Sequence, residues 1–379
     1  MDRSNTSICF LAGTLVNDGA ERQLIYMLKA LLEAPVRCRV MCLTEGEALE
    51  ADIRGLGVPI EFVGAGPSRL TRLAAIVSSL RRDPADIVQS SHFYTNLYAA
   101  LAARATGAVG IGAIRNDLIS ELEANGAFGW GQLMLPQFLV ANSCIACERA
   151  IRRGRSASRV HLVENAVDMD RFATRTRDDR LRDPRSIHLL SVNRLVPQKR
   201  VDRFLRLVKE VTVRLPEWTV EARIAGDGPL AHELEQLADS LGLPAGRVVF
   251  AGRVADPVPL YQWADLLVLT SDNEGTPNVV IEAMAAGLPA VATAVGGTPA
   301  LVAHGGGLLV EPHDETSLAQ AVVGLILDPS ARDRMGQAGH RQVAAGRSIP
   351  SLRRRLHAVH HQALGASHFP ASRKARRVE

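Results

Sequence analysis

Two acidic residues in one short stretch are placed to accept hydrogen bonds from hydroxyl groups. Glu274 and Glu282 both lie in residues 271–297, which read SDNEGTPNVVIEAMAAGLPAVATAVGG. Pro277 suits the first position of a helix, because its fixed φ fits the helix and its missing N–H would be unsatisfied there in any case. Glu274 is therefore predicted in the loop before a helix, and Glu282 more than one turn inside it. Because that helix is apolar on most sides, we expect it to be largely buried, and a buried Glu needs a partner.

Two basic residues follow another apolar run. After SIHLLSVN comes RLVPQKR, which places Arg194 and Lys199 at the exit of a predicted strand and just before a predicted helix. Two cations beside a helix N-terminus make an anion site, and the separation of these two suits a diphosphate. A solvated basic loop is the alternative that these residues alone leave open.

Small residues end two further apolar runs. Gly226 ends TVEARIAG and is followed by Asp-Gly-Pro, a turn that brings the backbone close to a ligand. The run VVFAGRV ends at Gly252, Arg253 and Val254, whose backbone could meet a flat base. Ligands of parallel sheets bind beyond the carboxyl ends of the strands, so these groups should meet the cations and the two carboxylates. A nucleoside diphosphate sugar has a group for each of them: phosphates for the cations, a base for the small-residue backbone, and vicinal hydroxyls for the two carboxylates.

Alternating strands and helices must position these residues. In the first half of the sequence, apolar runs alternate with segments of helical period, from a strand at residues 7–14 to one at 108–114. A second series begins at residue 186 and includes a helix at 201–214. Such alternation predicts an α/β fold with parallel sheets covered by helices on both faces. The pattern at residues 128–156 is mixed and predicts no single element.

The length and the distribution of charge predict two domains. At 379 residues the chain exceeds the size at which one core usually keeps growing. The charged, Pro-containing stretch 173–186 has no apolar periodicity and is predicted to be a linker between domains at 1–172 and 187–350. A basic helix is predicted at 351–366, packing back toward the first domain. Residues 367–379 form a basic tail that we expect to be disordered.

The composition is that of an ordinary globular protein. Apolar residues make up 47% and charged residues 22%, and a net charge of +4 does not demand nucleic acid. No run approaches the ~20 apolar residues of a membrane-spanning helix, and the N-terminus does not resemble a secretory signal, so we expect a cytoplasmic protein. Five cysteines, an odd number, fit a reducing compartment. Cys144 and Cys147 form a C-x-x-C without a second pair, which favours a structural role over a redox or metal site.

In their order along the chain, these motifs resemble the retaining glycosyltransferases of family 4. The E-x7-E of Glu274 and Glu282 is the most specific match, and NRLVPQK, AGDGP and VVFAGRV support it. DGAERQL and VENAVDMDRF are weaker matches in the N-terminal half, so the resemblance spans residues 8–347. It implies the GT-B fold, in which two Rossmann-like domains face each other across a cleft. The first domain would bind the acceptor and the second the nucleotide-sugar donor.

The resemblance also implies a role for each matching residue. Arg194 and Lys199 would hold the donor diphosphate and stabilise the charge on the leaving group in place of a metal, so we expect neither a metal nor another cofactor. Glu282 would accept hydrogen bonds from the ribose, and Glu274 would face the hydroxyls of the transferred sugar. Further donor-binding positions would be Gly226 and Arg253 together with Gly275, Thr276, Pro277, Asn278 and Val279.

The N-terminal half departs from the family pattern at its first loop. Where the family usually has Gly-Gly, this chain has Asp18 and Gly19, and an acid there would alter the choice of acceptor. Many members carry a His on a loop near the sugar, but the strand at 108–114 exits into Arg115. His92, at the exit of DIVQSS, is a candidate for the acceptor side, and a structural role for it is an equal alternative.

The expected function is retaining transfer of a sugar from a UDP- or GDP-linked donor to a glycan or a lipid-linked saccharide. Two alternatives stay open, a sugar-nucleotide epimerase or hydrolase that reuses the donor site and an inactive GT-B partner subunit. A dinucleotide-dependent dehydrogenase would need G-x-G-x-x-G after an early strand, and GTLVNDGAE lacks it. The Arg-rich segments 152–159 and 353–355 suggest peripheral contact with the inner face of a membrane, with a solvated surface as the alternative.

Overall fold

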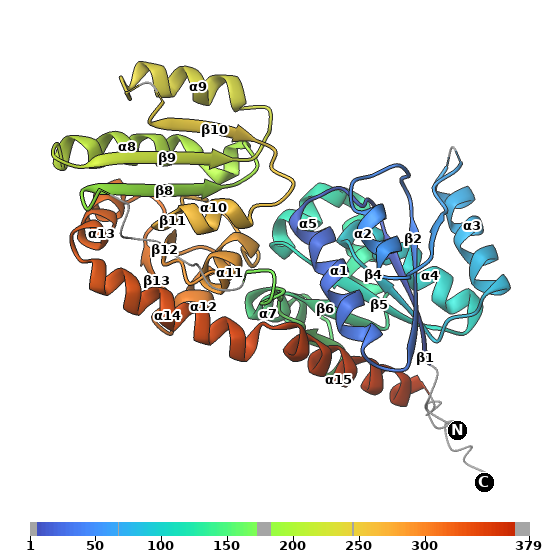
Figure 1. The fold of residues 1–379 in the computed structure, drawn as a ribbon. Helices are drawn as coiled ribbons and strands as arrows, with labels where there is room; N and C mark the ends of the chain where they lie inside the picture. Colours follow the sequence, from blue (N-terminus) through green and yellow to red (C-terminus); the bar gives the residue numbers. More distant parts are fainter. Residues whose placement is uncertain (1–5, 67, 173–182, 245, 368–379) are drawn as a thin grey trace, which may run out of the picture. The chain divides into compact units, whose positions relative to one another are not determined.

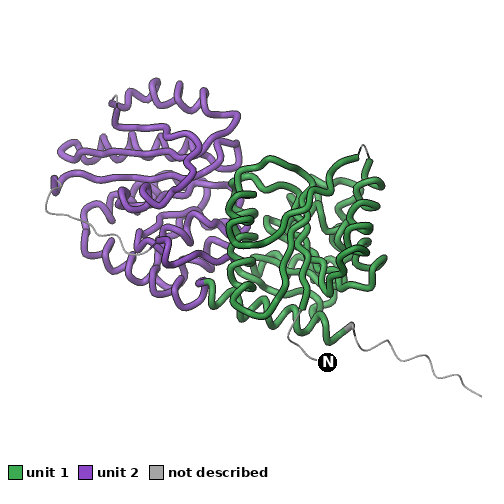
Figure 2. The backbone as a smooth tube through the Cα atoms, turned by 45° about the vertical axis from the view of Figure 1, so that its right-hand side comes forward, with its two compact units in different colours: residues 1–164, 349–379 green, residues 165–348 purple. Residues whose placement is uncertain are grey.

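The structure is a computed structural model that describes residues 6–66, 68–172, 183–244 and 246–367. The chain divides into two compact units (Figure 2). The first comprises Met1–Glu164 and Ile349–Glu379, and the second comprises Asn165–Ser348. The first unit therefore ends before the predicted linker at 173–186. Residues 173–182 of that linker and 368–379 of the predicted tail lie outside the described residues.

In the described part of the first unit, seven parallel strands form one sheet in the order β3-β2-β1-β4-β5-β6-β7 (Figure 1). The strands are β1 (Thr6–Ala12), β2 (Val36–Cys42), β3 (Ile60–Phe62), β4 (Ile87–Ser90), β5 (Val109–Ile114), β6 (Phe138–Ala141) and β7 (Val160–Leu162). The order reverses direction between β1 and β4, and open α/β sheets bind their ligands at such a topological switch point.

Helices connect these strands, as the alternating pattern predicted. They are α1 (Gly19–Leu32), α2 (Glu50–Gly55), α3 (Arg69–Arg82), α4 (Asn96–Thr106), α5 (Leu118–Asn125), α6 (Gly129–Met134), α7 (Cys144–Arg152) and α15 (Ile349–Ser367). Cys9 and Leu11 of β1 pack in one core with Ile76 and Leu80 of α3 and with the alanines of α4. Ser68 caps α3 by accepting a hydrogen bond from the Thr71 N–H at 3.2 Å.

The region that gave a mixed pattern, residues 128–156, holds α6, β6 and α7. β6 has four residues and α6 has six, and elements this short do not show a readable period. Cys144 and Cys147 begin α7 as free thiols. Burial raises the pKa of Cys147 to about 11, so its thiol stays protonated at neutral pH.

The C-terminal helix α15 belongs to the first unit and packs against α1. His360 of α15 is buried, and its Nε2 is bonded to Gln89 Oε1 of β4 at 2.7 Å. Arg353, one of the arginines considered for contact with a membrane, forms an ion pair with Glu33. Part of the positive charge on this helix is therefore compensated within the unit.

In the described part of the second unit, six parallel strands form a sheet in the order β10-β9-β8-β11-β12-β13. They are β8 (Ser186–Val192), β9 (Thr219–Ala225), β10 (Val248–Gly252), β11 (Leu266–Leu269), β12 (Ala290–Thr293) and β13 (Gly307–Val310). The helices are α8 (Val201–Arg214), α9 (Ala231–Ser240), α10 (Val258–Trp263), α11 (Asn278–Ala285), α12 (Thr298–Val302), α13 (Glu315–Leu327) and α14 (Pro329–Gly346). The switch point of this sheet lies between β8 and β11.

Both faces of the second sheet are covered by helices. Leu189 of β8 packs in a core with Phe204 of α8, whereas its neighbour Leu190 packs in a separate core with Met284 of α11. Because successive side chains point to opposite faces, a strand buried on both faces is largely apolar, and β8 carries Ile187, Leu189 and Leu190 in its buried centre. The predicted fold, two Rossmann-like domains with parallel sheets, is confirmed.

Candidate active site

The exits of β8 and β11 bring a lysine and a glutamate together at the switch point of the second unit. Lys199 Nζ donates a hydrogen bond to Glu274 Oε1 at 2.6 Å, and Ser271 Oγ donates to the same oxygen at 2.7 Å. The Glu274 side chain is 7% exposed and that of Lys199 is 15% exposed. Glu274 Oε2 has no hydrogen-bond partner among the described residues. The protein thus fixes one carboxylate oxygen and leaves the other open.

Further contacts hold the loops that carry this pair. Asp272 N–H donates to Gln198 O at 2.9 Å, and Thr270 Oγ1 donates to Arg200 O at 2.8 Å. Arg203, buried on α8, forms an ion pair with Asp272 at 2.6 Å. The two loops are therefore joined independently of the lysine and the glutamate, so a change in that pair should leave the loops in place.

The glycine pair that ends the opening motif lets the Glu274 loop pack closely. Gly297 N–H donates to Gly275 O at 2.6 Å. Gly296 has a φ of +54°, and a Cβ atom built there would lie 1.7 Å from Glu274 O. Only glycine combines this backbone conformation with this close approach, so a side chain at Gly296 would displace the loop.

The small residues after β9 serve a similar purpose. Gly226 has a φ of +138°, and a Cβ atom there would lie 1.8 Å from Asn193 O in the loop after β8. Gly226 N–H also donates to Gly252 O at 2.7 Å, which ties the exits of β9 and β10 together. Arg253 follows β10 and is exposed. The predicted small-residue wall thus lets three strand exits lie against one another.

The helix that follows Glu274 begins where the sequence placed it. Pro277, with φ −70° and ψ 112°, directly precedes the first residue of α11, which confirms the predicted start to within one residue. Asn165 Nδ2 donates to Thr276 O at 3.2 Å and to Asn278 Oδ1 at 2.8 Å. Sequence reasoning gave Asn165 no part in this site, because no local spacing connects it with residues more than a hundred positions away.

The second carboxylate, Glu282, is held by a tyrosine. Tyr261 Oη, on α10, donates to Glu282 Oε2 at 2.7 Å. The expectation that Glu282 is a buried acid was wrong, because the buried acid of this stretch is Glu274 and Glu282 is partly exposed. The reason is helical spacing: Asn278, Val279 and Glu282 share the partly exposed face of α11, and the opposite face packs on the sheet.

The two predicted cations differ in their surroundings. Arg194 follows β8 directly and is exposed, and its guanidinium has no ion-pair or hydrogen-bond partner in the described part of the chain. Lys199 is partly buried and bonded to Glu274. One cation is therefore free to meet a ligand, and the other is already neutralised by a carboxylate.

His92 lies at the switch point of the first unit. Gly13 N–H, after β1, donates to His92 Nδ1 at 3.1 Å, so the ring proton lies on Nε2, which donates to Glu21 Oε1 at 3.0 Å. Burial alone would raise the pKa of Glu21, but the hydrogen bonds from His92 and Thr14 and the attraction of the ring lower it overall. Tyr94 stacks on the imidazole at 5.2 Å. Sequence reasoning missed Glu21, which is 71 residues from His92.

The remaining predicted residues of the first unit are spread along the same edge of the sheet. Gly19 is exposed at the start of α1, and Asp18 is the N-cap residue of that helix without a side-chain capping hydrogen bond. Arg115 follows β5, and its Nη2 lies 3.3 Å from Met27 Sδ of α1. Among the described residues, no hydrogen bond or ion pair joins Arg115 to His92.

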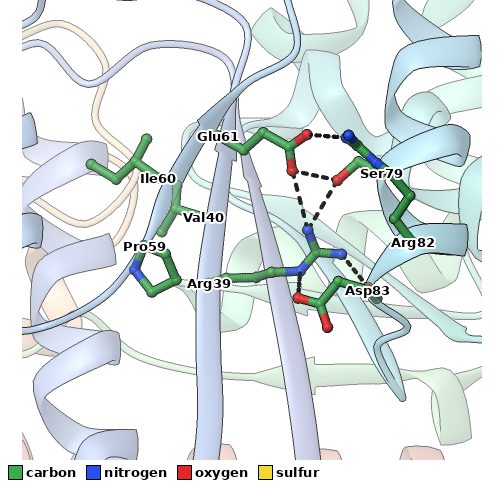
Figure 3. A pocket seen from close by; sticks show the side chains of 8 residues that line it. All are labelled: Arg39, Val40, Pro59, Ile60, Glu61, Ser79, Arg82 and Asp83. Atoms are coloured by element: carbon green, nitrogen blue, oxygen red, sulfur yellow. Dashed lines mark hydrogen bonds and ion pairs between the residues drawn. The ribbon is translucent and has the colours of Figure 1, made fainter.

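A surface pocket of about 360 Å³ lies elsewhere in the first unit (Figure 3). Its lining residues come from β2, β3, α3 and their flanks and are Arg39, Val40, Pro59, Ile60, Glu61, Ser79, Arg82 and Asp83. Arg82 Nη2 lies 2.7 Å from Glu61 Oε1, and Arg39 pairs with both Glu61 and Asp83 at 3.4 Å. The charges of this pocket are thus compensated internally, and none of the predicted site residues lines it.

Two features are absent from the described residues. Among them, no three His, Cys, Asp or Glu side chains are grouped so that they could hold a metal ion. Within the same ranges, no helix has the length and apolar character needed to cross a membrane.

Comparison with known sequences assigns both halves of the chain. The family model described as Glycosyltransferase Family 4 matches residues 17–171, and that described as Glycosyl transferases group 1 matches residues 186–328. D-inositol 3-phosphate glycosyltransferase 1 from Catenulispora acidiphila is 32% identical over 347 residues, which cover 81% of this chain and 82% of that protein. Sulfoquinovosyl transferase SQD2 from Arabidopsis thaliana is 27% identical over 76% of this chain, and the match spans 61% of the length of SQD2.

Comparison with solved structures supports the fold. HepE from Anabaena, crystallised in complex with UDP-glucose, aligns with a TM-score of 0.82 over 94% of this chain and 99% of its own, at 22% identity. Sucrose-phosphate synthase from Thermosynechococcus elongatus aligns with a TM-score of 0.78 over 95% of this chain at 18% identity. At these identities the likeness concerns the architecture alone.

Proposed function

The chain belongs to glycosyltransferase family 4, and we propose that it moves a sugar from a nucleoside diphosphate sugar to a hydroxyl group of an acceptor with retention of the anomeric configuration. The observation that carries this proposal is the ion pair of Lys199 and Glu274 at the switch point of the second unit. It sets a cation suited to phosphate beside a carboxylate suited to sugar hydroxyls, at the edge where parallel sheets bind ligands.

Each part of a UDP- or GDP-linked donor has a counterpart on this edge. The open Oε2 of Glu274 would accept hydrogen bonds from hydroxyls of the transferred sugar. Glu282 would receive the ribose diol, with Tyr261 fixing its orientation. The backbone of residues 275–279 at the start of α11 would lie near the sugar and the phosphates, where a helix N-terminus favours negative charge.

The two cations would act on the leaving group. Lys199 has three N–H donors, so it can keep Glu274 as one partner and take a phosphate oxygen as another. Arg194 has no competing partner among the described residues and suits a phosphate through two parallel hydrogen bonds. Together they would stabilise the negative charge that grows on the diphosphate as it leaves, and we propose that no metal ion is required.

Retention follows if the acceptor attacks the face of the sugar from which the diphosphate departs. The bond from the anomeric carbon to the phosphate oxygen breaks and a bond to the acceptor oxygen forms, while the acceptor proton passes to the leaving phosphate oxygen. No side chain is then required as a base. His92 fits a positioning role, because Gly13 N–H and Glu21 occupy both of its ring nitrogens.

We assign the acceptor to the first unit and propose that it is a glycan or a lipid-linked saccharide. Its hydroxyl would approach the edge of the sheet at the exits of β1 and β4, where Gly13 and His92 meet. A lipid-linked acceptor is presented at a membrane surface, so a cytoplasmic protein with peripheral contact to the inner face belongs to this proposal.

A donor screen followed by product analysis tests the proposed function. UDP- and GDP-sugars are screened for thermal stabilisation, and a donor present at a hundred times its Kd should add about 2.7 kcal/mol of stability. The product of a positive donor and an acceptor mixture is then analysed by NMR for its anomeric configuration. Glu274→Gln should lower transfer about a hundredfold or more, and the exposed Glu235→Gln of α9 should not.

Each other outcome has a defined meaning. Free sugar or an epimer without transfer would indicate the hydrolase or the epimerase. An inverted product would remove the retaining mechanism and leave the transferase. Full activity of Glu274→Gln would refute the assigned site.

A further inference from the structure

Arg115 in the first unit carries a positive charge that no acid in the described residues balances. It directly follows β5, at the edge of the sheet where ligands bind. Its Nη2 contacts Met27 Sδ at 3.3 Å, and its Nε is buried without a hydrogen-bond partner. Burial lowers the pKa of Arg115 to about 10, which still leaves the guanidinium charged at neutral pH.

The acids nearest in sequence are engaged elsewhere. Asp117 accepts a hydrogen bond from Ser120 N–H at 3.3 Å as the cap of α5, and it forms an ion pair with Arg149. Burial raises the pKa of Glu121 to about 7, although the backbone N–H groups of Asn116 and Arg115 act to lower it, and no ion pair joins Glu121 to Arg115 among the described residues. Neither carboxylate is therefore the counter-ion of the guanidinium.

The backbone that carries Arg115 is held firmly. Asn142 Nδ2, after β6, donates to Arg115 O at 2.7 Å, so the exits of β5 and β6 are tied together. The side chain is partly exposed, which leaves its charge within reach of a ligand. A guanidinium held in this way destabilises the fold unless an anion meets it, and arginine suits phosphate and carboxylate in geometry as well as charge.

We propose that Arg115 binds a phosphate or carboxylate group of the acceptor, so that the acceptor is an anionic molecule. This inference rests on the proposed function in assigning the acceptor to the first unit. The donor also carries phosphates, but its diphosphate is assigned to Arg194 and Lys199 of the second unit. The test must therefore separate an anion of the acceptor from that of the donor.

Binding of inorganic phosphate to the full chain saturated with UDP provides that separation. Isothermal titration at constant ionic strength should show phosphate binding to the wild type, and Arg115→Gln should weaken it at least tenfold. The affinity for UDP should change by less than twofold. Arg81→Gln is the matched control, because Arg81 is exposed on α3 and loses the same charge.

Stability in the absence of ligand gives a second readout. Arg115→Met replaces an unbalanced guanidinium with an apolar side chain of similar length, so the ligand-free variant should melt at a higher temperature than the wild type. A purely structural arginine would give the opposite shift. The same variant should lose the stabilisation that phosphate gives to the wild type.

Three results would overturn the inference. Phosphate binding that is absent from the wild type or equal in Arg115→Gln would remove the site. An equal loss of UDP and phosphate affinity would assign Arg115 to the donor. A lower melting temperature of ligand-free Arg115→Met would make it structural. If the wild type binds neither UDP nor GDP, the proposed function fails, and phosphate titration without nucleotide still tests Arg115. If it binds GDP and not UDP, GDP takes the place of UDP in the same titrations.

Discussion

Replacing Lys199 with methionine should destabilise the second unit. The change removes the ammonium group that meets Glu274 Oε1 at 2.6 Å and leaves a carboxylate that is 7% exposed with one remaining donor, Ser271 Oγ. Removing one partner of a buried ion pair typically costs about 3–5 kcal/mol. The hydrogen bond that remains offsets about 1 kcal/mol of this. The net loss of stability in Lys199→Met should therefore be about 2–4 kcal/mol.

Urea unfolding measured by tryptophan fluorescence at pH 7 tests this expectation. Two of the three tryptophans, Trp218 and Trp263, belong to the second unit, so the signal reports on it. Glu274→Gln should cost less than Lys199→Met at pH 7, because a lysine that is 15% exposed can turn its ammonium group to water. The double variant should recover part of the loss. A loss in the double variant that equals the sum of the two single losses would refute the reasoning, because it would show that the two groups do not stabilise each other.

Three further predictions follow from single contacts. Tyr261→Phe removes the 2.7 Å hydrogen bond to Glu282 and should weaken UDP binding about threefold to tenfold, measured by isothermal titration. Gly296→Ala should abolish transfer, whereas Gly287→Ala, with a φ of +69° but nothing within 4 Å of the added Cβ, should cost only about 1 kcal/mol of stability and keep activity. Burial, with a smaller contribution from a neighbouring histidine, lowers the pKa of His360 to about 4, so the unfolded state binds more protons below about pH 6.5. First-unit stability should fall by about 1.4 kcal/mol per pH unit from there to pH 4, and His360→Gln should remove that slope in acid titrations followed by circular dichroism.

The sequence was sufficient to predict the second unit closely because its signals are local. The helix at 201–214 coincides with α8, and α11 begins one residue after Pro277. Each of these depends on apolar period or on proline geometry within a few residues. The direct bond of Lys199 to Glu274 could not be predicted, because spacing places two loops on one edge without fixing the rotamers in which their side chains meet. Ser271 lies only three residues before Glu274, but nothing in the sequence indicates that its hydroxyl group donates a hydrogen bond to that carboxylate.

The first unit was harder to predict from sequence, because fewer of its signals are local. β6 and α6 are too short to show a period. The partner of His92 is Glu21, on a different helix, so only the folded sheet brings the two together at the switch point. The unbalanced charge of Arg115 is likewise invisible in sequence, where Asp117 and Glu121 would have been natural partners.

The glycines show how the motifs of the second unit hold its strand exits together. Gly226 packs against the carbonyl of Asn193, and Gly296 packs against that of Glu274, so a side chain at either position would force apart the loops that bear the cations and the carboxylate. The glycines of these motifs therefore serve backbone packing between strand exits. Only a few of the remaining side chains, such as Lys199 and Glu274, are placed to contact a ligand. Backbone packing of this kind tolerates few substitutions and leaves a recognisable sequence. In the first unit, Gly13 N–H and Glu21 hold His92, and Arg115 contacts Met27. None of these contacts belongs to a short sequence motif, so the anion that we assign to Arg115 has to be identified by binding and not by motif.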